Sequence, residues 1–121
     1  MTLLITGLIN FWAPIMNVDP HVALAVVEHE SHFNPDAIGK LNEQGLFQLR
    51  PEFFKQYTLK QLRDPYTNIS VGLQYLAKMK KECIHKKDIT YLICFNAGKS
   101  GARKIKHPEL FSYVKAIKRL M

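Results

Sequence analysis

The chain has few cysteines, and their spacing matches no familiar framework. Its 121 residues include two cysteines, Cys83 and Cys94, which do not form a C-x-x-C pair. A disulfide scaffold for a domain of this size needs more of them. We therefore expect Cys94, which lies in an apolar stretch, to be a buried thiol, with a Cys83–Cys94 bridge as the alternative. Nothing here indicates a structural metal.

Lysine and arginine are missing from residues 1–39, and Lys40 is the first of either. Residues 1–16 are apolar, but a signal peptide needs a basic segment before its apolar core. The run is also interrupted by Asn10 and Pro14 and is too short to span a bilayer. We expect a first helix that packs within the fold, with a secretion signal as the alternative.

Acidic residues are also scarce, at 10 against 17 Lys and Arg, which gives a net charge of +7. This balance favours an anionic partner such as a cell-wall polymer, a membrane surface or nucleic acid. Nucleic-acid binding would require a docking motif or aromatic stacking platforms among the basic residues. Neither is present, so we expect no nucleic-acid partner.

Two short segments resemble cofactor motifs but lack the required spacing. The histidines of His29-Glu30-Ser31-His32 are three residues apart, whereas the zinc protease motif H-E-x-x-H places them four apart. Gly98-Lys99-Ser100 resembles the end of a phosphate-binding loop, but Ile93 stands where that motif needs its first glycine. We expect neither a metal nor any other cofactor.

The most informative stretch runs from Val18 to Pro51. Asp19 is a good helix N-cap, and Pro20 suits the first helical position because its missing N–H would be unpaired there. Residues 22–27 are apolar on every side, which predicts a buried helix. This helix carries two carboxylates near its end, Glu28 and Glu30.

A carboxylate on a buried helix is costly to ionise, so its pKa should rise toward neutrality. Such an acid can donate a proton near neutral pH, as general acid catalysis requires. Glu28 and Glu30 point roughly 200° apart around the helix axis, and both faces are largely apolar. The helix pattern alone does not decide which of the two is functional.

The rest of the chain predicts short helices and a mainly α fold. We expect one helix from Pro51 through Tyr57, a longer one that begins at Asp64-Pro65, and another that is capped by Asp88 and stops at Gly98. The last helix should begin at Pro108, with Leu110, Val114 and Ile117 facing inward. A small β-hairpin is expected only around residues 36–50.

Four sequence blocks, in order, resemble the soluble lytic transglycosylase (SLT) family and cover nearly the whole chain. The first block contains Glu30-Ser31, residues 33–37 (FNPDA), residues 45–49 (GLFQL) and Pro51. The later blocks are Asp64-Pro65 with Asn68-Ile69, Gly72 and Tyr75-Leu76; Phe95-Asn96-Ala97-Gly98; and Tyr113-Val114. The ordered set is specific, although each block alone is weak. The chain also resembles goose-type lysozymes, more distantly.

This resemblance implies a single lysozyme-like catalytic domain over residues 1–121. It also implies cleavage of the β-1,4 bond between N-acetylmuramic acid and N-acetylglucosamine in peptidoglycan, with formation of 1,6-anhydro-N-acetylmuramic acid. Glu30 is implied to protonate the leaving oxygen and then to act as a base. The substrate's own N-acetyl group would assist in place of a second carboxylate.

The resemblance assigns further roles in the first block, with plain packing as the alternative for each. Ser31 would hydrogen-bond near the catalytic carboxyl group. Gly45 would allow close approach of the backbone, and Leu46 and Phe47 would wall the groove. Gln48 would bind the N-acetyl group of the sugar.

Residues of the later blocks complete the implied site. Asn96 would contact the substrate, and Tyr113 would pack against or hydrogen-bond to Glu30. The family usually has tyrosine where this chain has Phe95, so one hydroxyl group near the site is missing. Asn42 and Glu43 also replace the usual Gly-Ala before the Gly45 block.

Two alternative functions remain open. Glu43 could position a water molecule, which would make the protein a hydrolytic muramidase that uses Glu30 and Glu43. The chain could also be a non-catalytic module for wall binding or assembly.

We expect a monomer without a transmembrane segment, attracted to the anionic cell wall by its basic patches. Because no signal peptide is recognised, we expect synthesis in the cytoplasm and delivery by another system, such as phage lysis, a virion or a secretion apparatus.

Overall fold

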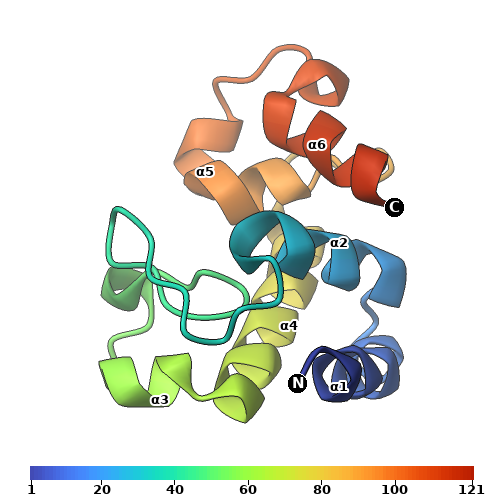
Figure 1. The fold of residues 1–121 in the computed structure, drawn as a ribbon. Helices are drawn as coiled ribbons and strands as arrows, with labels where there is room; N and C mark the ends of the chain where they lie inside the picture. The colour runs from blue at the N-terminus through green and yellow to red at the C-terminus, as the bar shows by residue number, and fades with distance from the viewer.

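The computed structural model describes all 121 residues and is built almost entirely from helices (Figure 1). The α-helices are α1 (Thr2–Ile15), α2 (Pro20–Ser31), α3 (Leu59–Arg63), α4 (Pro65–Glu82), α5 (Leu92–Ala102) and α6 (Ser112–Leu120). Two short 3₁₀ helices, η1 (Pro51–Phe53) and η2 (Pro108–Leu110), precede α3 and α6. The predicted mainly α, lysozyme-like fold is confirmed.

The predicted hairpin is reduced to two isolated antiparallel bridges, Ile38 with Gln44 and Gln44 with Leu49. Residues 32–50 otherwise form a loop of turns. Several of its residues have a positive φ that interrupts regular strand pairing, including Asn42 at 63° and Gln48 at 50°.

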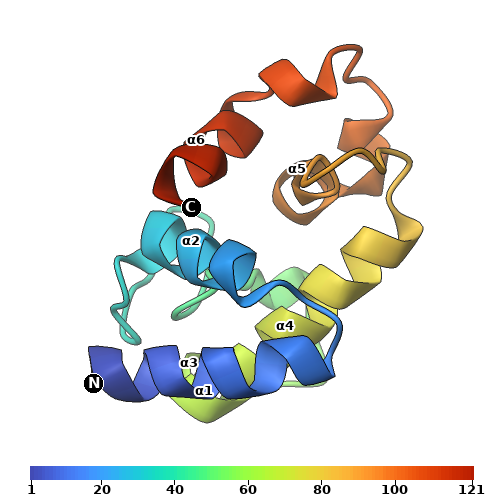
Figure 2. The same cartoon turned by 90° about the vertical axis from the view of Figure 1, so that its right-hand side faces the viewer.

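Helix α2 lies at the centre of the molecule, between α1 on one side and α6 on the other (Figures 1 and 2). The predicted N-cap is present, since the Asp19 carboxylate accepts a hydrogen bond of 2.9 Å from the backbone N–H of His21. The buried residues of α2 lie on most of its circumference: Val22, Ala23, Ala25, Val26, Val27 and Ser31. Contacts on two sides therefore fix the position of its C-terminal end.

Helix α1 packs within the fold, as predicted from its apolar sequence. It buries one stripe, formed by Ile5, Ile9 and Ala13, against α2 and α4. Its other face remains exposed, and Leu3 is 88% accessible. None of the six helices combines the length and apolarity needed to cross a bilayer.

Two of the predicted helix starts in the middle of the chain are corrected by the structure. The helix expected to run from Pro51 to Tyr57 is only η1. A separate α3 follows, capped by reciprocal hydrogen bonds between Thr58 and Gln61. Asp88 does not cap a helix, because its φ is 53° and its carboxylate pairs with Lys118 at 2.8 Å.

The predicted helix at Pro108 begins as η2, and α6 follows after a break at Phe111. Leu110 is exposed rather than inward-facing, because it belongs to η2 and lies before the break at Phe111. The buried residues of α6 are Tyr113, Val114 and Ile117.

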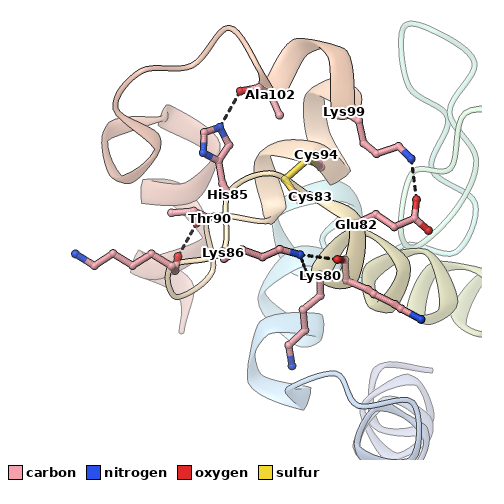
Figure 3. The surroundings of a disulfide bond; sticks show 11 residues. Lys80, Glu82, Cys83, His85, Lys86, Thr90, Cys94, Lys99 and Ala102 are labelled. Atoms are coloured by element: carbon pink, nitrogen blue, oxygen red, sulfur yellow. Dashed lines mark hydrogen bonds and ion pairs between the residues drawn. A yellow bond between two sulfur atoms is a disulfide. The ribbon is translucent and has the colours of Figure 1, made fainter.

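Cys83 and Cys94 form a disulfide bond, which corrects our prediction of a free buried thiol (Figure 3). Their Cα atoms are 5.9 Å apart, within the range found for disulfides. Cys83 is the C-cap residue of α4, and Cys94 lies in the first turn of α5. The bond therefore anchors the part of α5 that continues into Phe95 and Asn96.

Replacing both cysteines with serine should lower the free energy of unfolding by about 2–3 kcal/mol, because the open chain regains entropy in the unfolded state. Urea denaturation of the double variant and of oxidised and reduced wild-type protein measures the effect. The variant should match the reduced protein. Equal stability of the variant and the oxidised protein would show that the bond contributes nothing.

Candidate active site

Glu30 lies in the last turn of α2 and is partly buried, whereas Glu28 is exposed. The helix pattern left both carboxylates as candidates, and the packing of α2 separates them. Of the two, only Glu30 lines the groove described below. The structure thus favours the residue that the SLT resemblance also indicated.

Tyr113 of α6 donates a hydrogen bond of 2.8 Å from its hydroxyl group to Oε2 of Glu30. The predicted contact between these residues, which are 83 positions apart, is therefore present. Burial raises the pKa of Tyr113 well above its usual value, so the hydroxyl group keeps its proton and remains a donor. The His29 ring packs edge-on against Tyr113, with centroids 5.1 Å apart.

Burial raises the pKa of Glu30 from 4.5 to about 7. The hydrogen bond from Tyr113 opposes this shift because it stabilises the ionised carboxylate. The negative charge of Glu43 adds to the shift. Near neutral pH, both protonation states of Glu30 are therefore accessible, as expected for a group that donates one proton and later accepts another.

Glu30 opens onto a groove of about 570 Å³ between the loop, α4 and α5. This volume lies within the range of small-molecule sites. Five of the predicted site residues line the groove: Glu30, Glu43, Gln48, Phe95 and Asn96. The prediction missed the other lining residues: Leu49, Arg50, Phe53, Phe54, Tyr75, Met79, Ala97, Gly98, Lys99 and Ser100.

An aromatic wall forms one side of this groove. The ring of Tyr75 packs against Phe54 at 5.2 Å and against Phe95 at 5.4 Å between centroids. Sites of this kind combine apolar surface with a few polar groups that fix the ligand's orientation. Phe95 retains the packing role of an aromatic ring at this position, although it lacks the hydroxyl group usual in the family.

Leu46 and Phe47 do not wall the groove, contrary to our prediction, because both are fully buried in the core. The ring of Phe47 fills the space beside Gly72, where an added Cβ would lie 2.3 Å from it. Ser31 also lies outside the groove, and its hydroxyl group donates to the carbonyl of Val27 at 3.0 Å. It therefore bonds within α2 rather than to the carboxyl group of Glu30.

Asn68 of α4 holds the loop in place, a role that sequence analysis missed. Its fully buried amide donates to the carbonyls of Gln44 at 2.8 Å and Leu62 at 2.7 Å. Its side-chain oxygen accepts from the backbone N–H of Phe47 at 2.8 Å. Gly45 is needed here because its φ is +72° and an added Cβ would lie 2.5 Å from the Asn68 amide nitrogen.

Gln48 is held by the same loop. Its amide nitrogen donates to the carbonyls of Ala37 at 3.1 Å and Gly45 at 2.9 Å. Both N–H donors of the side chain are thereby used. Its carbonyl oxygen remains available as an acceptor in a residue that lines the groove.

A carboxylic acid with a pKa near neutrality beside a partly aromatic groove is an arrangement that glycan-cleaving enzymes use. The comparison with known families agrees with this geometry. The sequence model of the family described as "Transglycosylase SLT domain" matches residues 7–111, and the chain belongs to this family.

Among characterised proteins, the chain is similar to the "Endo-type membrane-bound lytic murein transglycosylase A" of Salmonella paratyphi B, and equally to that of Salmonella typhimurium. In both cases 33% of the aligned residues are identical, and the alignment covers 54% of this chain and 41% of the relative. The chain thus spans less than half the length of these relatives.

Proposed function

We propose that the protein is a peptidoglycan lytic transglycosylase, acting on the β-1,4 bond between N-acetylmuramic acid and N-acetylglucosamine. The observation that carries this proposal is the position of Glu30 on the groove, with a pKa raised to about 7. We further propose that residues 1–121 form one catalytic domain.

Glu30 begins in its protonated form and donates its proton to the glycosidic oxygen as the bond to the anomeric carbon breaks. The acetamido oxygen of the same muramic acid residue bonds to that carbon. The ionised Glu30 then takes the proton of the C6 hydroxyl group. The C6 oxygen of muramic acid then bonds to the anomeric carbon of the same residue and displaces the acetamido oxygen. The product is a 1,6-anhydro sugar, and no water is consumed.

We propose that Gln48 and Asn96 orient the acetamido group in this reaction. The free carbonyl oxygen of Gln48 suits the N–H of an acetamido group, since the Gln48 amide nitrogen already has its partners. Asn96 lines the groove and is exposed, so its amide is available to substrate.

A hydrolytic muramidase is the second candidate, because Glu43 lines the same groove and its charge acts on Glu30. However, the Oε1 atom of Glu43 is already used, accepting the backbone N–H of Leu41 at 2.8 Å. We propose that Glu43 primarily shapes the loop and tunes Glu30.

Mass spectrometry of the fragments released from purified sacculi distinguishes these possibilities. Anhydro ends are expected. Reducing ends, one water heavier, would establish the hydrolase with Glu43. Binding without any released fragments would establish the wall-binding module.

Replacing Tyr113 with phenylalanine should shift the alkaline limb of the kcat/KM profile upward by roughly one pH unit. The lost hydrogen bond, of about 1 kcal/mol, stabilises the ionised form of Glu30, so its pKa should rise further. The protonated acid then persists to higher pH. Steady-state rates on soluble glycan strands across pH 5 to 9 measure the shift.

Tyr91→Phe is the matched control, since Tyr91 is also buried, whereas the hydrogen bond to Glu30 comes from Tyr113. Its profile should coincide with that of the wild type. An unshifted profile for the Tyr113 variant would show that this hydrogen bond does not tune Glu30.

We also propose that the protein acts as a monomer at the cell wall, outside the reducing cytoplasm. The Cys83–Cys94 disulfide supports such a compartment, because disulfides persist under oxidising conditions. The excess of basic residues supports attraction to the anionic wall, and binding to sacculi should weaken with added salt. Delivery by phage lysis, a virion or a secretion apparatus stays a prediction.

A further inference from the structure

Two cationic side chains line the groove, and the proposed reaction uses neither of them. Arg50 lies between the loop and η1, and Lys99 lies in α5 directly after the kink at Gly98. The two come from segments that are far apart in the sequence, yet they border the same cavity as Glu30.

Arg50 is held in place but retains an unused donor. Its guanidinium carbon lies 4.8 Å from the centroid of the Phe53 ring, and one terminal nitrogen pairs with Glu52. Its Nε atom is buried and has no hydrogen-bond partner. That N–H is shielded from the groove, so a ligand there would bind the N–H donors of the terminal nitrogens, of which only one pairs with Glu52.

Lys99 is placed on the groove by a break in α5. The φ of Gly98 is +77°, which interrupts the helix just before Lys99. The Lys99 ammonium group pairs with Glu82 at 2.7 Å (Figure 3) and remains half-exposed. Its charge also acts on Tyr75, where burial raises the pKa and Lys99 lowers it. Lys99 is therefore near the aromatic wall.

Two carboxylates and two cations line the groove, and Arg50 and Lys99 are its only positively charged hydrogen-bond donors. The carboxylates that pair with the two cations, Glu52 and Glu82, do not line the cavity. The carboxylates that do are Glu43 and Glu30, and Glu30 is partly protonated near pH 7. Both cations thus have hydrogen-bond donors to spare for a substrate carboxylate.

We infer that Arg50 and Lys99 form a carboxylate subsite that binds the stem peptide of peptidoglycan. In a peptide-bearing strand the lactyl carboxyl group of muramic acid is consumed in an amide bond, so the negative charges lie on the stem. This inference rests on the proposed function, since it assigns part of the same groove to the same substrate.

The test measures binding by the inactive Glu30→Gln protein, alone and combined with Arg50→Gln or Lys99→Met. Three soluble probes are used: peptide-bearing glycan fragments, the same fragments after amidase removes the stem, and chitotetraose. Each added substitution should weaken binding of the peptide-bearing probe by roughly threefold to tenfold at low salt, the range for partly exposed charge pairs with hydrogen bonds. Chitotetraose, which has no carboxylate, should bind unchanged.

Matched controls remove the same charges outside the groove. The control variants are Arg103→Gln and Lys104→Met, because Arg103 and Lys104 are exposed and do not line the groove. They should not change affinity for any probe. Arg50→Lys and Lys99→Arg should restore most of the binding and the salt dependence, which separates a charge effect from a folding defect.

Three results would overturn the inference. Unchanged affinity for the peptide-bearing probe would exclude a role for the two cations. An equal loss for all three probes would indicate a general effect on groove shape. An equal loss for the stem-free strand would assign the subsite to the free lactyl carboxylate.

The proposed function is tested separately by the wild-type protein. If it releases anhydro fragments while the subsite variants bind normally, only the inference fails. If it releases no fragments and the Glu30→Gln protein binds no glycan, the proposed function fails as well.

Discussion

Replacing Glu30 with glutamine should reduce the rate of glycan cleavage by roughly 10³-fold or more while the protein still binds sacculi. The amide does not donate a proton as an acid at neutral pH and cannot accept one afterwards. The variant therefore lacks the group that carries out both proton transfers. Turbidity loss of sacculi and the yield of soluble fragments measure the change.

Glu28→Gln provides a closely matched control, because it makes the same chemical change two residues away in the same helix. Glu28 is exposed and does not line the groove. This variant should cleave at the wild-type rate. A comparable loss in both variants would mean that the helix end, rather than the Glu30 carboxyl group, is responsible.

The Glu30 variant should also differ in stability in a pH-dependent way. The pKa of Glu30 rises from 4.5 to about 7 on folding, so the native state binds the proton more tightly than the unfolded state. Stability from this group is present below pH 4.5 and is lost as pH rises through 7. At pH 8 the glutamine variant should therefore be more stable than wild type, by on the order of 2 kcal/mol.

Replacing Asn68 with alanine should lower the free energy of unfolding by about 3–5 kcal/mol. The change leaves two backbone carbonyls and one backbone N–H without the partners that Asn68 supplies in the interior. Cleavage should fall too, because Gln48 is carried by the loop that Asn68 anchors. Urea denaturation and cleavage rates below the unfolding transition measure the two effects.

Asn68→Asp keeps the acceptor for the Phe47 N–H but loses both donors, so its effect on the loop should identify which bonds dominate. Lys78→Ala, an exposed change on the same helix, should leave stability within about 0.5 kcal/mol. If Asn68→Ala were as stable as Lys78→Ala, the loop would have to be held by other contacts.

Local signals in the sequence predicted much of the fold because their causes are local. Asp19 followed by proline gives a capped helix start, and the all-apolar segment after it gives a buried helix. The same reasoning failed at Asp88, where the backbone takes a positive φ and the side chain pairs with Lys118 of α6. Lys118 is 30 residues from Asp88 in the sequence, so the residues around Asp88 do not indicate this pair.

In the candidate site, too, features with local causes were predictable and features made by distant contacts were not. The acid on a buried helix was predictable, and the resemblance to a family selected Glu30 over Glu28. The core positions of Leu46 and Phe47 depend on how the loop folds over α4, which no periodicity encodes. Asn68, Arg50 and the Cys83–Cys94 bond act through contacts made only when distant segments meet.

A direct titration of the Glu30 carboxyl group tests the central claim most sharply. The ¹³C chemical shift of glutamate side-chain carboxyl groups can be followed with pH in wild-type protein, with Glu30→Gln used to assign the signal. A midpoint near 7 is expected, since burial outweighs the hydrogen bond from Tyr113. A midpoint near 4.5 would mean that Glu30 is an ordinary, solvated carboxylate and would contradict its role as a proton donor.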